Sequence, residues 1–154
     1  MRDGIGEEMM ELKPISKMFT ESLLINYNMS LDELNKLILQ SSSELYEDKF
    51  FKMFAVLNEK VCVGTISLFE HSSSIVSIGP DIFKEYRQRG YATEAMKAAM
   101  DIARVKGYKI VCQQIRTNNS ASINLHAKLG FETDNYVFRN RNNNEIVLYI
   151  KSLI

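Results

Sequence analysis

A short segment that combines arginine with glycine, Arg87-Gln88-Arg89-Gly90-Tyr91-Ala92, lies between an apolar run and an amphipathic pattern. The first turn of a helix has main-chain N–H groups without internal partners, and the helix dipole adds partial positive charge there. Gly90 lets the backbone approach a ligand closely, while Arg87 and Arg89 add positive charge. The segment therefore favours binding of a phosphate or pyrophosphate. A plain loop with two solvated arginines is the alternative.

Two common nucleotide-binding motifs are excluded for this segment. It lacks the Gly-Lys-Ser/Thr of a P-loop, and it lacks the second glycine of the dinucleotide-binding fingerprint. A second segment with a recognisable pattern lies further along the chain, at residues 119–131, and reads NSASINLHAKLGF. The two segments have to be interpreted together.

Together they make the chain similar to the GNAT superfamily of acetyl-CoA-dependent N-acetyltransferases. The first segment fits the family signature R/Q-x-x-G-x-G/A, and residues 119–131 resemble the family run N-x-x-A/S-h-x-L-Y-x-K-x-G-F. Val63-Gly64-Thr65-Ile66 also looks like the family's third strand. The resemblance covers residues 50–131 by motif and residues 9–49 by element order. It is closest to the branch with ribosomal-protein and small-molecule amine acetyltransferases.

The resemblance implies a binding site for acetyl-CoA as co-substrate. Strand main chain would pair with its pantetheine arm, the turn before the helix would hold its pyrophosphate, and Asn119 would contact it near the pantetheine. The implied cofactor-binding residues are Ile82, Phe83, Arg87, Gln88, Arg89, Gly90, Tyr91, Ala92, Thr93, Asn119 and His126. Structural alternatives stay open, because Ile82 and Phe83 also suit a core and Asn119 also suits a helix cap.

His126 departs from the family pattern, which usually has tyrosine at this position to protonate the departing CoA thiolate. Imidazole has an unperturbed pKa of about 6.5 and can do the same work near neutrality. His126 is therefore the candidate catalytic residue. A structural histidine packed beside the cofactor is the alternative.

The general bases of the relatives are missing from this chain. Gln114 stands where some relatives have glutamate, and an amide cannot take up a proton at ordinary pH. Val76 and Ile78 stand where others have glutamate or histidine. The remaining candidates are Asp81, Glu70, His71 and ordered water. Main-chain N–H groups near residues 81–83 are expected to stabilise the tetrahedral oxyanion.

Hydrophobic periodicity predicts the elements that position these residues. Strands are expected at 9–13, 50–57, 61–69, 75–83, 109–115, 136–139 and 145–150, and helices after Ser16, after Ser30, over 93–106 and over 120–129. Gly79-Pro80 is expected to cause a bulge or a local end of pairing. The order predicts an α/β (α+β) mixed sheet. The resemblance implies a splayed, mainly antiparallel sheet flanked by helices, open between the strands that end at Phe83 and Ile115.

Composition favours one ordinary globular domain over residues 1–154, with residues 1–8 as a flexible N-terminus. Hydrophobic residues make up 45% of the 154 residues, and 19 basic residues balance 19 acidic ones. This balance argues against nucleic acid as partner, and no apolar run suits a membrane span or a signal peptide. Cys62 and Cys112 are interpreted as buried thiols, with no metal site and a cytoplasmic location.

The sequence thus predicts an enzyme that moves acetyl directly from acetyl-CoA to a primary amine of a small molecule or a peptide N-terminus. Residues 15–50 and the hairpin at 136–150 are expected to line the acceptor pocket. An acetyl-CoA-binding module without catalysis is the main alternative, and an interaction protein on the same scaffold is the other. A homodimer is left open.

Overall fold

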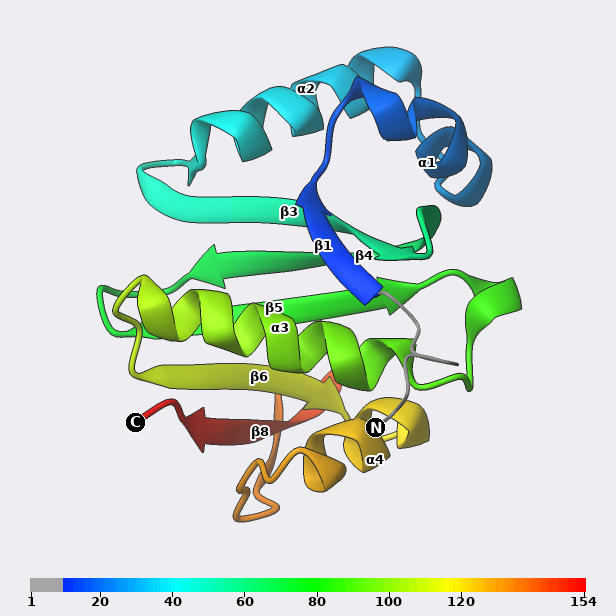
Figure 1. Cartoon of the computed structure of the whole chain (residues 1–154). Coiled ribbons are helices and arrows are strands. Elements are labelled where there is room, and N and C mark those ends of the chain that lie inside the picture. The colour runs from blue at the N-terminus through cyan, green and yellow to red at the C-terminus, as the bar shows by residue number, and fades with distance from the viewer. Residues whose placement is uncertain (1–9) are drawn as a thin grey trace, which may run out of the picture.

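Runs of aromatic and β-branched residues build the strands of a central sheet, as their preference for a pleated surface predicts. The computed structural model describes residues 10–154, and Figure 1 shows the sheet with helices packed on it. The strands are β1 (Met10–Pro14), β2 (Leu45–Tyr46), β3 (Lys49–Asn58), β4 (Val61–Glu70), β5 (Ile75–Ile82), β6 (Ile110–Arg116), β7 (Val137–Arg139) and β8 (Glu145–Ser152). Their order in the sheet is β1-β3-β4-β5-β6-β8-β7, with β2 paired to β3.

Four α-helices cover the two faces of this sheet. They are α1 (Thr20–Asn26), α2 (Leu31–Ser43), α3 (Tyr91–Val105) and α4 (Ser120–Lys128). Short 3-10 turns precede α1 at Lys17–Phe19 and follow β5 at Lys84–Tyr86. The helix predicted after Ser30 is confirmed as α2, and it begins with a capping box: the Ser30 hydroxyl accepts from the Glu33 N–H, and the Glu33 carboxylate accepts from the Ser30 N–H.

Alternating residues of the strands separate two cores. Phe54 and Val56 of β3 pack with α3, whereas Ala55 and Leu57 pack with α1 and α2 on the other face. His126 of α4 contacts Phe131 and Tyr149, both in the core that α3 covers, so α3 and α4 share a face, as Figure 1 shows. On the opposite face, α1 and α2 lie over the β3 side and leave β6 and β8 uncovered.

The sheet opens between β5 and β6. All neighbouring strands pair antiparallel except these two, which run parallel and pair only at Ile75–Ile110 and Val76–Val111. On its other side β5 stays paired with β4 through Ile82. The predicted splayed, mainly antiparallel sheet is therefore confirmed, with its opening where it was expected.

The bulge expected at Gly79-Pro80 is absent, because Pro80 keeps its register opposite Ile66 of β4. The Phe83 N–H donates to the Val63 carbonyl of β4. Because main-chain groups along a strand point alternately to its two neighbours, the groups of Pro80 point away from β4. Pro80 therefore turns its nitrogen toward the open β6 side, where no ladder bond is lost. The register shift of the sheet lies instead at Val56/Leu57 of β3.

Smaller differences from the predicted elements have local causes. The helix expected after Ser16 is divided into a 3-10 turn and α1, and the short strand β2 was not predicted. Leu31, the first residue of α2, is apolar but 52% exposed. Met9 and residues 1–8 lie outside the described residues. Within residues 10–154, the structure contains no helix of the length and apolar character that a membrane crossing needs.

Candidate functional site

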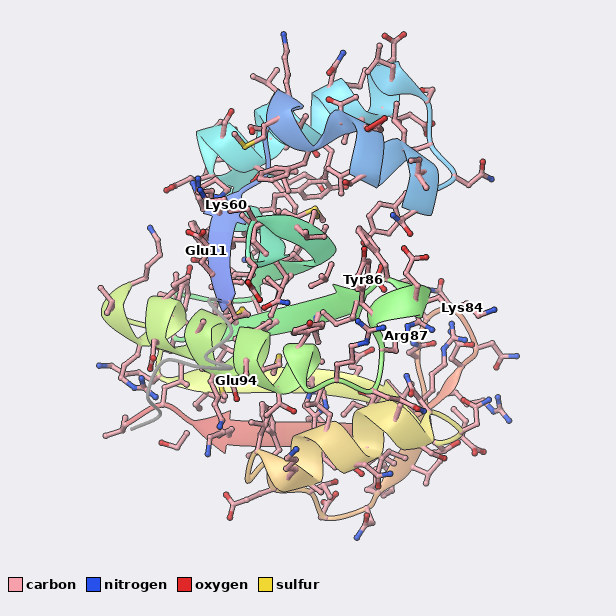
Figure 2. All side chains as sticks on the ribbon, turned by 45° about the vertical axis from the view of Figure 1, so that its right-hand side comes forward. Glu11, Lys60, Lys84, Tyr86, Arg87 and Glu94 are labelled. Carbon is pink, nitrogen blue, oxygen red and sulfur yellow. The ribbon has the colours of Figure 1, made fainter. Side chains whose placement is uncertain are left out.

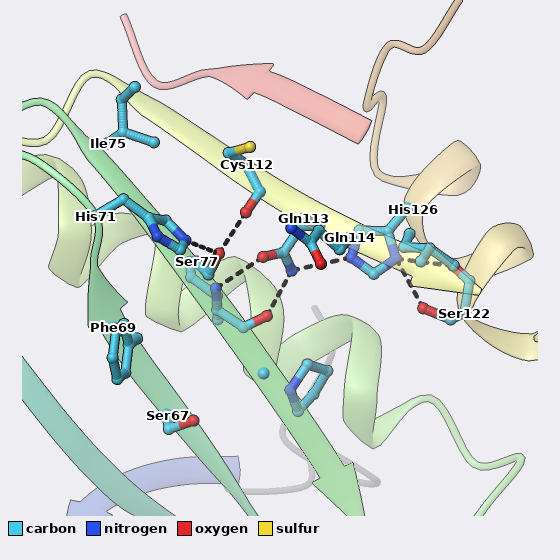
Figure 3. Close-up of a pocket in the computed structure, with 14 residues that line it drawn as sticks. Ser67, Phe69, His71, Ile75, Ser77, Cys112, Gln113, Gln114, Ser122 and His126 are labelled. Carbon is cyan, nitrogen blue, oxygen red and sulfur yellow. Dashed lines mark hydrogen bonds between the residues drawn. The ribbon is translucent and has the colours of Figure 1, made fainter. Parts of the chain in front are cut away.

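The opening between β5 and β6 is closed at its inner end by side chains. Beyond Val76, the Ile78 N–H donates to the Gln113 Oε1 atom at 2.9 Å, and the Gln113 Nε2 group donates to the Ile78 carbonyl. The Ser77 hydroxyl donates to the Cys112 carbonyl, as Figure 3 shows. The Ile78 main chain and the Cys112 carbonyl thus have partners without the ladder. One amide and one hydroxyl let the two strands separate at this point.

Gln113 also fixes the protonation state of His126. Because the Ile78 N–H can only donate, the Gln113 atom facing it is the oxygen, and the nitrogen at 3.1 Å from His126 Nε2 is a donor. His126 Nε2 therefore accepts, and Nδ1 carries the proton that it donates to the Ser122 carbonyl at 2.7 Å. Burial lowers the pKa of His126, against the smaller effect of the Ser122 bond, and the residue is only 2% exposed.

This arrangement argues against the proton-donor role that the sequence assigned to His126. A neutral ring whose Nε2 atom accepts a hydrogen bond from Gln113 has no proton there to give. The arrangement matches the alternative, a structural histidine beside the opening. The ring links α4 to β6 and to the aromatic residues Phe131 and Tyr149.

The edge of β5 offers one main-chain donor to the opening. Pro80 has no N–H, and the alternation of the ladder directs the N–H groups of Asp81 and Phe83 toward β4. Ile82 faces the opening, where its carbonyl accepts from the Arg87 Nε atom at 2.8 Å. Of residues 80–83, Ile82 alone directs an N–H into the opening. The Phe83 main chain is engaged instead, since its carbonyl accepts from the Tyr86 N–H.

The start of α3 lies at the outer end of the same opening. Gly90 is the N-cap with φ of +86°, a conformation that favours glycine, and no side chain caps the first turn. The first-turn N–H groups of Tyr91, Ala92 and Thr93 have no partner within the helix. Such groups suit an anion, and the anion site that the sequence predicts here stays a prediction. Gln88 also has a positive φ of 63°, so the turn is sharply bent.

The basic residues of this turn brace it. Arg87 contacts the Ile82 carbonyl and lies 3.9 Å from the Asp81 carboxylate, and Arg89 lies over the Tyr86 ring at 5.6 Å. Figure 2 shows Lys84, Tyr86 and Arg87 at the end of β5 beside the start of α3. Both arginines hold the segment in shape and keep positive charge beside the anion site.

Asn119 caps α4, because its Oδ1 atom accepts from the Ser122 N–H at 3.1 Å. Asn119 is thus a helix N-cap, which was the structural alternative for this residue. Its contact with a cofactor stays a prediction.

A cavity of about 660 Å³ opens on the sheet face opposite α3. Along each strand, alternate residues point away from α3, and these residues form the wall of the cavity. They are Ser67 and Phe69 of β4, Ser77 and Gly79 of β5, and Cys112 and Gln114 of β6. Through the opening it reaches Gln113, Ser122 and His126. No residue of 15–50 or 136–150 lines it, and the expectation that those segments line the acceptor pocket stays a prediction. The wall is formed by strands because the face between them is open.

The candidate bases lie in different places. His71 lines the cavity, and its Nε2 atom lies 2.6 Å from the Ser77 hydroxyl. Since that hydroxyl donates to the Cys112 carbonyl, His71 Nε2 is the donor to Ser77, and no described residue bonds to Nδ1. Glu70 accepts from the Tyr108 hydroxyl and is not part of the wall.

Asp81, the other candidate base, is held by a network that the sequence did not reveal. The Tyr27 hydroxyl donates to its carboxylate at 2.7 Å and lies 2.8 Å from the Thr65 hydroxyl. Burial raises the pKa of Tyr27, so the phenol stays a donor. Asp81 therefore has Tyr27 on one side and Arg87 on the other.

Two further site residues were missed or misplaced at the sequence level. Gln113 stands between Val111 and Ile115 on the buried face of its strand. A polar residue at a position where the alternation predicts an apolar one was the sequence feature that could have identified it. Cys112 was expected to be buried but is half-buried and lines the cavity, while Cys62 is buried as expected. Burial raises the pKa of both thiols, which disfavours the reactive thiolate.

Comparison with known proteins agrees with this geometry. The family model of the acetyltransferase (GNAT) domain matches residues 9–132, and the chain belongs to this family. No curated protein matches the chain in sequence.

Solved structures share the fold at low sequence identity. RimL, a ribosomal L7/L12 alpha-N-protein acetyltransferase in complex with coenzyme A, has a TM-score of 0.80 and 14% identity over 93% of both chains. Spermidine N-acetyltransferase from Vibrio cholerae, with CoA and spermine, has a TM-score of 0.75 and 16% identity over 94% of this chain and 95% of the other. The yncA protein from Salmonella typhimurium, with acetyl-CoA, has a TM-score of 0.75 and 15% identity over 94% of both.

Gln113→Leu tests the closure of the opening against its neighbour Gln114→Leu. The first change removes both partners of the buried Ile78 main chain, so we expect the free energy of unfolding to fall by about 2 kcal/mol or more. The second changes an exposed side chain and should stay within about 0.5 kcal/mol. Urea denaturation measures both. Equal effects of the two changes would contradict the role of Gln113.

The lowered pKa of His126 predicts a pH dependence of stability. Between its folded pKa and the unfolded value of about 6.5, the unfolded chain binds more protons, so stability falls as the pH drops through this window. His126→Gln should lose less stability between pH 7 and 5 than the wild type does. His71→Gln, which alters the other of the two histidines, is the control. Parallel curves for wild type and His126→Gln would contradict the prediction.

Proposed function

We propose that this protein is an acetyl-CoA-dependent N-acetyltransferase that acts on a primary amine of a small molecule or a peptide N-terminus. One observation carries the proposal: an opening between two strands joins an uncapped helix N-terminus to a cavity on the far face of the sheet. Relatives in the GNAT family that share the fold are solved with CoA or acetyl-CoA, which supports acetyl-CoA as the co-substrate.

The co-substrate is assigned to the opening by its chemistry. Its pyrophosphate is an anion and suits the N–H groups of the first turn of α3. Its pantetheine arm carries amide groups, whose carbonyl oxygens can accept a hydrogen bond from the free N–H of Ile82 on the β5 edge. Its thioester would then face the cavity near Gly79 and Pro80, where an amine can approach.

The reaction needs little from the protein beyond position and proton handling. The amine nitrogen bonds to the thioester carbonyl carbon, the C–S bond breaks, and overall one proton passes from nitrogen to sulfur. His71 is assigned as the proton acceptor through water, because it lines the cavity with Nδ1 as the acceptor of its neutral ring. Asp81 is less suitable, since Tyr27 and Arg87 engage its carboxylate. His126 holds the opening in shape and keeps its proton on Nδ1.

Gly90→Ala tests the co-substrate site against Gly107→Ala. Both glycines have a positive φ, +86° and +102°, and an added methyl group meets nothing within 4 Å at either place. Both changes therefore carry a similar backbone strain of about 1–2 kcal/mol. Only Gly90→Ala should weaken binding of CoA, by about tenfold or more, because it alone lies at the first turn of α3. Titration calorimetry with CoA measures the affinity.

Two outcomes would contradict the proposal. Wild-type protein that fails to bind CoA would overturn the assignment of the co-substrate. Wild-type protein that binds CoA but releases no thiol from acetyl-CoA with any amine would instead identify the alternative, a binding module without catalysis.

A further inference from the structure

Among residues 10–154, the cavity wall that faces the acceptor carries no acidic side chain. Its polar groups are the hydroxyls of serines, the amides of Gln113 and Gln114, the imidazoles of His71 and His126 and the thiol of Cys112. The apolar part of the wall comes from residues such as Phe69 and Ile75. All of these groups are neutral when the two histidines are unprotonated, so the wall offers hydrogen bonds without a compensating negative charge.

The nearest carboxylates along the same strands are already engaged. Asp81 lies two residues beyond Gly79 on the same face of β5, and it accepts from the Tyr27 hydroxyl and lies 3.9 Å from Arg87. Glu70 is the last residue of β4, and it bonds to Tyr108. Neither carboxylate lines the cavity, and Asp81 already has the Arg87 cation beside it.

An acceptor with several ammonium groups therefore fits this cavity poorly. Moving an ammonium out of water without a carboxylate partner costs several kcal/mol. The attacking amine is exempt from this cost, since it must lose its proton before it can react. Every further ammonium on a polyamine or an aminoglycoside would remain charged and unpaired.

The cavity also continues onto a surface that suits an extended chain. The register places Ile150 of β8 beside Cys112 and Leu148 beside Gln114, on the same face of the sheet. Leu148 and Ile150 are 38% and 42% exposed, and no described helix covers this part of the face, over β6 and β8. A chain that leaves the cavity over β6 can thus bury apolar side chains on β8 and find both donors and acceptors in the amide of Gln114.

From these features we infer that the acceptor is the N-terminal amine of a peptide with neutral first residues, and that polyamines are rejected. This inference rests on the proposed function and narrows its acceptor. It follows from the uncharged wall seen in Figure 3 and from the uncovered apolar strip of β8 beside it. Amide and hydroxyl groups of such a peptide match the serines and Gln114, and its single amine needs no acidic partner.

Thiol release from acetyl-CoA tests this selectivity with two acceptors. We use the tetrapeptide Ala-Ser-Leu-Ala amide and spermidine at pH 8, with the Nα-acetylated peptide as a blank. We expect kcat/KM for the peptide to exceed that for spermidine by about 100-fold, since such a ratio corresponds to about 2.7 kcal/mol. Equal rates, or a preference for spermidine, would overturn the inference and leave the proposed function standing. No turnover with either acceptor would overturn the inference, whereas the proposed function fails only if no amine releases thiol from acetyl-CoA.

A charge introduced into the wall gives an independent check. Gln114→Glu places a carboxylate in the cavity and should shift the kcat/KM ratio toward spermidine by about tenfold or more. The experiment compares the ratio of kcat/KM for the two acceptors, so an effect of the substitution that changes both values equally cancels. Asn35→Asp adds the same charge on the exposed side of α2, away from the cavity, and should leave the ratio unchanged. A ratio that both variants shift equally, or that neither shifts, would overturn the inference.

Discussion

The way one parallel strand pair ends determines the rest of this site. After Val76 the ladder between β5 and β6 stops, and buried backbone groups that lose their partners would cost a large fraction of the stability of a small domain. The amide of Gln113 bonds both groups of Ile78, and the Ser77 hydroxyl bonds the Cys112 carbonyl. The strands can therefore separate in the middle of a core while the Ile78 main chain and the Cys112 carbonyl keep hydrogen-bond partners.

From this closure follow the roles of the two faces of the sheet. On one face α3 and α4 pack over the opening, and the first turn of α3 brings unpaired N–H groups to its outer end. On the other face no described helix covers β6 and β8, so the opening leads into a cavity. A phosphate-bearing ligand and an amine can thus reach the same point from opposite directions. His126 contributes by linking α4 to Gln113 in one defined protonation state.

The sequence predicted features that local chemistry determines. The helix after Ser30 begins with a capping box that needs only neighbours three residues apart, and the helix over 93–106, with Met96 and Met100 buried, follows from helical periodicity. The position of the sheet opening came from the resemblance to the family. These features involve residues close in the chain or motifs with fixed spacing.

Features that depend on distant partners were not predictable in this way. Tyr27 and Asp81 meet across 54 residues, and Gln113 meets Ile78 across 35. Whether Pro80 disturbs a ladder depends on which neighbour its nitrogen faces, and that is decided by strand order. The wall of the cavity likewise comes from three neighbouring strands and not from the flanking segments that seemed free to form it.

A crystal structure of the protein with CoA tests the central claim most directly. The account predicts the pantetheine arm between β5 and β6, bonded to the Ile82 N–H, with the pyrophosphate at the first turn of α3. It also predicts that Gln113 keeps both bonds to Ile78 in the complex, because the closure exists before the ligand binds. CoA bound elsewhere on the molecule, or a Gln113 side chain displaced from Ile78 by the ligand, would contradict the account.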